Sequence, residues 1–176
     1  RRRIIFNSDT QKWDKVDEYP GLTAETPIFG ILKEGAELII GAYREKNTLG
    51  LYAYDLNQKT ITRSLFHNDT YDVSGVVLSK DGESVIGAKY TGESDRVELL
   101  GDYGTMLNDL RIQYPAYDVD YVDQTDEGST VLFKMSAPYD PGGMFIQTFG
   151  ETSPTRIVSN YSDLSSNDMG EVIAIK

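Results

Sequence analysis

The amino-acid sequence predicts an all-β fold, a partial β-propeller of about three and a half blades of four-stranded antiparallel sheet, with one short helix at the rim. Three observations predict it. A hairpin pattern recurs about every 46 residues, further short strand-like runs follow each copy, and one such sheet cannot bury both of its faces alone. Chance similarity among ordinary hairpins is the alternative, but a β-sandwich gives no reason for this period.

The repeated hairpin turns are marked by an acidic residue followed by glycine. They are Glu34-Gly35, Asp81-Gly82 and Glu127-Gly128, and their glycines are 47 and 46 residues apart. Glycine readily adopts the positive φ that a tight hairpin turn requires. The second and third copies also open with the same Tyr-Asp-Val tripeptide, at Tyr71 and Tyr117, again 46 residues apart. Two independent markers in register favour a true repeat.

Each strand is predicted from an alternating or continuous apolar run between turn residues. Residues 1–26 supply two strands, the outer half of a blade, and residues 27–70, 71–116 and 117–160 are three further blades. Closed propellers have at least four blades, so this arc leaves open blade faces. The predicted strands are 2–7, 12–17, 27–32, 38–43, 50–56, 60–66, 75–79, 84–90, 96–100, 117–123, 129–135, 144–149 and 155–158.

A short helix replaces the fourth strand of the second full blade. Apolar residues recur at helical spacing from Tyr103 to Tyr114, and Pro115 cannot continue a helix. Asp102 is the predicted N-cap. We expect a helix over about 103–113 on the propeller rim, its apolar stripe packed against the blade; docking of a partner is the alternative.

The composition limits the classes of partner. There are 17 Lys and Arg against 28 Asp and Glu, a formal charge of −11, which argues against nucleic acid and anionic membranes as partners. Cysteine is absent, which excludes disulfides, cysteine nucleophiles and thiolate metal sites but assigns no compartment. Both ends of the chain are interpreted as cut sites in a longer protein.

The sequence predicts no catalytic, cofactor-binding or metal-binding residues. Residues 92–96 contain Gly-Glu-Ser but lack the closing glycine of a nucleophile elbow. A single histidine, His67, ends a predicted strand and is interpreted as a surface or turn residue rather than a general base. Asp118, Asp120 and Asp123 form the densest carboxylate group, but their spacing does not match a helical calcium loop.

One glycine-rich segment is interpreted as a structural turn. Residues 140–143, Asp-Pro-Gly-Gly, are predicted to join two strands of the last blade, because proline fixes φ and glycine permits chain reversal.

Several segments together resemble the propeller of the prolyl-oligopeptidase-like (S9 family) serine peptidases, the group with acylaminoacyl peptidases and dipeptidyl aminopeptidases. The resemblance covers roughly residues 13–176. None of its motifs is specific by itself, and the resemblance depends on the order in which they follow one another. The segments are Leu51 to Leu56, Tyr71 to Gly82, Val85 to Tyr90, the helical insert Asp102 to Gln113, the Asp140 to Gly142 loop, and the closing strand 171–176.

The resemblance implies a parent enzyme that cleaves short peptides by a Ser-Asp-His mechanism. The propeller would cover the active site and restrict access to short peptides, and residues 171–176 would lead into an α/β-hydrolase domain. The catalytic residues would all follow Lys176, so none is assigned here. The implied partners are that hydrolase domain and a peptide substrate. A stand-alone interaction propeller without a hydrolase is the alternative.

The open blade faces also predict self-association. A bare blade face is broadly apolar, and soluble monomers rarely expose such surfaces. We therefore expect a homodimer formed through the open blade faces.

Overall fold

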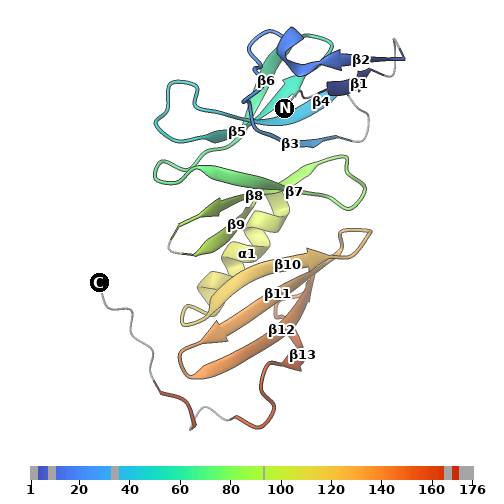
Figure 1. Cartoon of the computed structure of the whole chain (residues 1–176). Helices are drawn as coiled ribbons and strands as arrows, with labels where there is room; N and C mark the ends of the chain where they lie inside the picture. Colours follow the sequence, from blue (N-terminus) through green and yellow to red (C-terminus); the bar gives the residue numbers. More distant parts are fainter. Residues whose placement is uncertain (1–3, 8–10, 33–35, 93, 165–167, 171–176) are drawn as a thin grey trace. The chain divides into compact units, whose positions relative to one another are not determined.

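The computed structural model describes residues 4–7, 11–32, 36–92, 94–164 and 168–170. It confirms an all-β, partial propeller-like fold (Figure 1). In the described part of the chain there are antiparallel sheets of two, four, three and four strands, accompanied by one α-helix. Within each sheet, strands that follow one another in sequence are neighbours, which is the meander expected of a propeller blade.

The bounds of the elements follow the predicted runs closely. The elements are β1 (Ile4–Asn7), β2 (Lys12–Lys15), the 3₁₀ turn η1 (Val16–Glu18), β3 (Ile28–Ile31), β4 (Glu37–Ala42), β5 (Gly50–Asp55), β6 (Thr60–Phe66), β7 (Val73–Leu78), β8 (Val85–Thr91), β9 (Asp95–Leu99), α1 (Gly101–Gln113), β10 (Asp118–Gln124), β11 (Thr130–Ala137), β12 (Asp140–Thr148) and β13 (Thr155–Ser159).

The chain divides into two compact units, Arg1–Glu98 and Leu99–Lys176. The first unit contains the β1–β2 and β3–β6 sheets and all of the β7–β9 sheet except the last residue of β9. The second contains α1 and the β10–β13 sheet.

In the first unit, the β3–β6 sheet is buried on both faces. Ile39 and Ile40 are 0% and 1% exposed, although successive residues of a strand point to opposite faces. Ile40 belongs to a cluster with Val16 of η1, on the side of β1 and β2. Ile39 belongs to a second cluster with Val73 of β7 and Ala88 of β8. This sheet is therefore stacked between neighbours on either side, as a blade must be.

Two of the three predicted glycine turns are confirmed. Gly82 has φ +74° and its amide donates to the carbonyl of Ser79 at 2.9 Å. Gly128 has φ +69°, and its amide donates to Thr125 at the same distance. The first turn, Glu34-Gly35, and the closing strand 171–176 lie outside the described residues.

The helix forms where expected, but the predicted N-cap is wrong. Leu100 is the N-cap, because it has the extended backbone of that position (φ −116°, ψ 160°), and it makes no side-chain capping bond. Asp102 lies two residues further on, inside the first turn, where a carboxylate interacts favourably with the helix dipole. The helix buries Met106, Leu107 and Leu110.

The turn predicted at residues 140–143 is also wrong in position. The chain reverses at Pro138 and Tyr139, and β12 already begins at Asp140. The glycines serve close strand approach instead. A Cβ on Gly142, which has φ +78°, would collide with the carbonyl oxygen of Met135, and one on Gly143 would collide with that of Val158.

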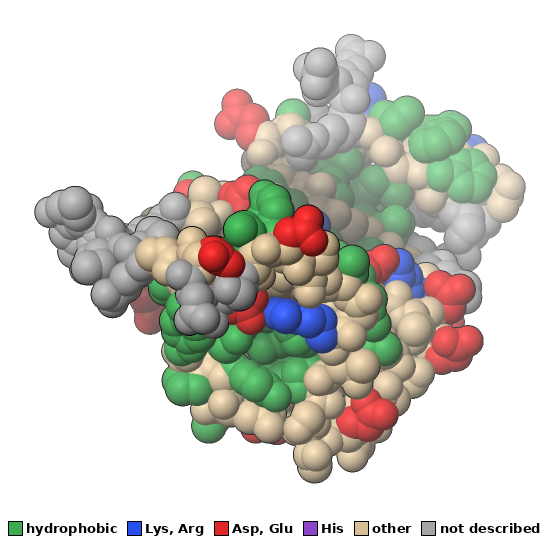
Figure 2. All heavy atoms as spheres, turned by 90° about the horizontal axis from the view of Figure 1, so that it is seen from below, with side chains coloured by type: hydrophobic (Ala, Val, Ile, Leu, Met, Phe, Trp, Pro, Cys, Tyr) green, Lys and Arg blue, Asp and Glu red, His purple; other side chains and the backbone are tan. Residues whose placement is uncertain are grey.

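In the second unit, one face of the β10–β13 sheet is covered and the other is open. Val131 and Phe133 of β11 are 0% exposed. On the opposite face, Leu132 is half-buried and Lys134 is exposed. Figure 2, which views this end of the chain from below, shows hydrophobic side chains gathered around basic ones. No helix within the described residues is long and apolar enough to cross a membrane.

Candidate functional site

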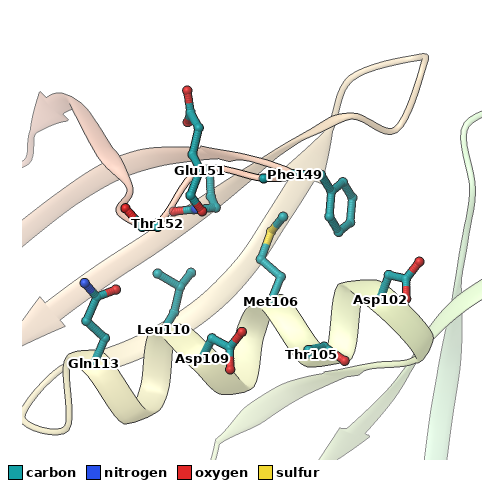
Figure 3. A pocket seen from close by; sticks show the side chains of 11 residues that line it. Asp102, Thr105, Met106, Asp109, Leu110, Gln113, Phe149, Glu151 and Thr152 are labelled. Atoms are coloured by element: carbon teal, nitrogen blue, oxygen red, sulfur yellow. The ribbon is translucent and has the colours of Figure 1, made fainter.

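A cavity of about 460 Å³ lies between α1 and the end of β12 in the second unit. Figure 3 shows Met106 and Leu110 extending from the helix toward the end of β12 and the turn that carries Phe149. The apolar floor therefore comes from the buried side of α1. The lining residues are Asp102, Thr105, Met106, Asp109, Leu110, Gln113, Gln147, Phe149, Gly150, Glu151 and Thr152.

The helix is held over this cavity by its first aromatic residue. The Tyr103 hydroxyl donates to the carbonyl of Gly128 at 3.1 Å, in the turn between β10 and β11. The same ring meets Phe149 edge to face at 5.2 Å between centroids. At the other end of the helix, Gln113 Nε2 donates to Ser153 Oγ at 3.4 Å. Contacts at both ends fix α1 against the sheet.

A buried amide forms part of the cavity wall. Gln147 is 4% exposed, and its Nε2 donates to the carbonyl of Glu151 at 2.6 Å. Among the described residues, its Oε1 finds no hydrogen-bond donor, and neither polar atom of the Gln124 side chain finds a partner. Gln124 and Gln147 flank Val131 on adjacent strands of the same sheet face. This part of the core therefore contains unpaired polar groups, which are costly when buried.

The mouth of the cavity is acidic. Asp102, Asp109 and Glu151 are exposed residues of its lining, and Glu151 Oε2 accepts from the amide of Thr148 at 3.3 Å. No group of three or more His, Cys, Asp or Glu side chains in the described ranges could hold a metal ion. The cavity therefore offers carboxylates around an apolar floor, an environment suited to a small polar or cationic group.

A second constellation is centred on Asp140 at the start of β12. Arg156 Nη2 donates to both carboxylate oxygens, at 3.0 and 2.8 Å, and the amide of Gly142 donates to Oδ1 at 2.8 Å. The Tyr117 hydroxyl donates to Oδ2 at 2.9 Å. Burial alone would raise the pKa of Asp140, but the hydrogen bonds from Gly142, Tyr117 and Arg156 hold that pKa below its ordinary value.

The pKa of the tyrosine in this constellation is shifted in the opposite direction, upward. Burial, together with the hydrogen bond to Asp140 and its charge, raises the pKa of Tyr117 to about 12. The Tyr117 ring meets Tyr114 and Tyr139 edge to face, at 6.0 and 6.2 Å. Its phenol therefore stays neutral at physiological pH and donates to Asp140, and the arrangement ties the residue before β10 to β12 and β13.

The histidine is more enclosed than a plain surface residue. The His67 side chain is 16% exposed, its Nε2 lies 2.8 Å from Thr48 Oγ1, and its Nδ1 lies 3.3 Å from Asp69 Oδ1. This order of groups resembles a nucleophile, base and acid. However, Thr48 is buried and its hydroxyl donates to the carbonyl of Asn68, so its proton is directed away from the imidazole. The group links two loops of the first unit.

The other residues that the sequence analysis considered as candidate site residues lie in strands or in connections between strands. Asp118 and Asp120 share a sheet face, as expected for an extended segment, and lie opposite Ser136 and Lys134. The carbonyl of Ser94 accepts from the amide of Gly92 at 3.0 Å, and both residues lie in the connection between β8 and β9.

Sequence reasoning missed both the cavity and the Asp140 constellation. The cavity forms where the chain beyond β12 returns over α1, and no local feature of the sequence shows that contact. For Asp140, the signal was the Asp-Pro-Gly-Gly segment itself, but its partners Tyr117 and Arg156 are 23 and 16 residues away.

Comparison with solved structures gives weak similarity. No protein-family model matches the chain, and no curated protein sequence matches it. A solved prolyl endopeptidase structure, described for the role of inter-domain dynamics in catalysis and specificity, is similar over 87% of this chain with 7% sequence identity and a TM-score of 0.40. This chain corresponds to 25% of the length of that protein.

Proposed function

We propose that this chain is the non-catalytic β-propeller part of a serine peptidase of the prolyl-oligopeptidase type, which covers the active site and restricts access to short peptides. The observation that carries the proposal is the β3–β6 sheet, a four-stranded meander buried on both faces. Two of the segments that resemble the peptidase propellers fall on this stack: Leu51 to Leu56 overlaps β5, and Val85 to Tyr90 lies within β8.

The physical basis of the proposed role is rigidity. Sheets that share dry interfaces on both faces cannot separate without exposing their cores, so a ring of them maintains a fixed aperture. Ala53 and Ala88 are 0% exposed and belong to the cluster between the β3–β6 and β7–β9 sheets. Small side chains at this position allow the sheets to pack closely.

The test compares the full-length protein with the 176-residue chain. We expect a serine-directed fluorophosphonate to label the full-length protein and not the isolated chain. The full-length protein should cleave short peptides and leave folded proteins intact. Leu51→Ala, which loosens the β3–β6 interface, should increase cleavage of a long unfolded substrate relative to a tripeptide substrate, because the aperture loses its fixed size.

Thr62→Ala is the matched control, since Thr62 is exposed on β6, and the ratio of long to short substrate cleavage should be unchanged. Failure of the full-length protein to react with the fluorophosphonate would overturn the peptidase assignment and favour a stand-alone interaction propeller. Equal cleavage of long and short substrates by the unmodified protein would overturn the gating role.

A further inference from the structure

We propose that the cavity between α1 and the end of β12 binds a primary alkylammonium group, whose charged head is held by Asp109 and Gln147. Its alkyl stem lies on Met106 and Leu110, which form the floor of the cavity. This inference does not rest on the proposed peptidase function, because it uses only residues of the second unit.

The buried amide of Gln147 is an acceptor without a donor. Gln147 lies opposite Val131 in the ladder, so its side chain extends from the covered face of the sheet, and it lines the cavity. Its Nε2 donates to the carbonyl of Glu151 at 2.6 Å, whereas its Oε1 meets no donor among the described residues. A buried oxygen without a donor costs free energy. A ligand N–H group in the cavity would pair it and remove that cost.

The other polar side chains of the lining also leave acceptors, rather than donors, for a ligand. Thr105 Oγ1 donates to a backbone carbonyl at 3.3 Å, and Gln113 Nε2 donates to a serine hydroxyl at 3.4 Å. By contrast, the carboxylates of Asp102 and Asp109 have neither a hydrogen bond nor an ion pair within the part of the chain that the structure describes. Carboxylates only accept and an ammonium only donates, so the open groups of the cavity match a cation.

The second unit does not neutralise these carboxylates itself. Among its described residues the basic side chains are Arg111, Lys134 and Arg156, and none of them lines the cavity. Arg111 follows Asp109 by two residues, which places it about 200° around the helix. Lys134 lies on the open face of the sheet, and Arg156 binds the carboxylate at the start of β12. A cation at Asp109 must therefore come from a ligand.

The apolar floor selects a cation that carries an alkyl stem. Met106 and Leu110 are buried, and Figure 3 shows both extending from α1 toward the end of β12, with Asp109 on the helix between them. A hydrated metal ion gains nothing from such a floor. An alkylammonium buries its methylene groups there and keeps its charged head beside the carboxylate. The volume of about 460 Å³ lies within the usual range of small-molecule sites.

Two sources supply this chemistry, a free aliphatic diamine and a lysine side chain of a peptide. Asp102 precedes Asp109 by about two helical turns, or about 10 Å along the axis, and lines the same cavity. A diamine can place its second ammonium near Asp102, whereas a lysine side chain has one ammonium only. The relative affinity of the two ligands therefore identifies the source.

Isothermal titration calorimetry of the 176-residue chain with cadaverine, with Nα-acetyl-lysine amide and with neutral pentanol tests the proposal. We expect both amines to bind with a dissociation constant of about 1 mM or below, and pentanol to bind at least about tenfold more weakly. Cadaverine that binds more than about threefold more tightly than the lysine derivative indicates a free diamine as the ligand. Equal or tighter binding of the lysine derivative indicates a peptide.

Variants separate the site from general attraction to an acidic protein. Asp109→Asn should weaken the binding of both amines at least about fivefold, because it removes the carboxylate that faces the head group. Asp163→Asn is the matched control and should leave binding unchanged, since it removes the same charge from an exposed residue outside the cavity. Gln147→Met keeps a side chain of similar length without the amide and should weaken binding at least about threefold.

NMR spectra of the unmodified protein give a readout that does not depend on any variant. The side-chain amide signal of Gln147 should shift as either amine is added, because the ammonium donates to its Oε1. Circular dichroism verifies that each variant folds.

Four results would overturn the proposal. They are no binding of either amine up to about 10 mM, pentanol that binds as tightly as the amines, equal weakening by Asp109→Asn and Asp163→Asn, and a Gln147 amide signal that stays constant while an amine binds. The last result would place the amine elsewhere on the protein.

Discussion

At the scale of single residues, Asp140 joins several segments of the second unit through hydrogen bonds. Its carboxylate receives hydrogen bonds from a backbone amide, a tyrosine and an arginine, and Arg156 also lies over the Phe145 ring, with its guanidinium carbon 4.9 Å from the centroid. The Asp140 side chain is 19% exposed, so these bonds form where water competes weakly.

Replacing this carboxylate should destabilise the second unit. We expect Asp140→Asn to lower the free energy of unfolding by about 1 to 2 kcal/mol, because the amide cannot accept at both oxygens, and the half-exposed Arg156 keeps the cost moderate. Urea unfolding at neutral pH measures it. Asp163→Asn, at an exposed residue, is the control and should change the stability by less than about 0.5 kcal/mol.

The same carboxylate predicts a dependence of stability on pH. Because the folded-state pKa of Asp140 is lowered, its contribution is complete above the ordinary carboxyl pKa of about 4 and is lost as the pH falls through the lowered value. Unfolding midpoints of the unmodified protein and Asp140→Asn should therefore converge as the pH falls below about 4. A constant difference down to the lowest pH would contradict this linkage.

A comparison of Gly142 with Gly150 distinguishes the cost of backbone strain from the cost of a steric collision. Gly142→Ala should cost about 2 kcal/mol or more beyond Gly150→Ala, because a methyl group at 142 meets the Met135 carbonyl, whereas position 150 has a positive φ of +90° but open space around it. Equal losses for the two variants in urea unfolding would show that only the backbone conformation matters.

At the scale of elements, α1 is held by packing rather than by capping. Its N-cap makes no side-chain hydrogen bond, and its buried residues Met106, Leu107 and Leu110 lie on one side. Leu107→Ala should therefore lower the free energy of unfolding by about 2 to 4 kcal/mol, while Ile112→Ala, on the exposed side, should have almost no effect. A similar loss for both variants would indicate that helix propensity, not packing, holds the helix.

The sequence predicts the strands and the helix better than it predicts the contacts between them. Alternating apolar runs between turn glycines predicted the strands because hydrophobic periodicity and positive-φ turns are local properties. The failure at residues 140–143 has the same origin: Gly142 and Gly143 are required by the Met135 and Val158 carbonyls of neighbouring strands, which local sequence does not reveal. The cavity was missed because it depends on how α1 meets β12.

At the scale of the whole molecule, both units follow one plan, consecutive strands in an antiparallel meander. The two-sided burial of the β3–β6 sheet distinguishes this plan from a sandwich, in which each sheet has one buried and one wet face. Within the second unit, by contrast, the β10–β13 sheet has one covered and one open face.

Urea unfolding of two neighbouring variants on β4 tests this stacking most directly. Ile39→Ala and Ile40→Ala truncate side chains that point to opposite faces of one strand and belong to different clusters. Stacked sheets predict that each variant loses about 2 to 4 kcal/mol. A loss below about 0.5 kcal/mol for either one would mean that its face is solvated, and would contradict the blade arrangement.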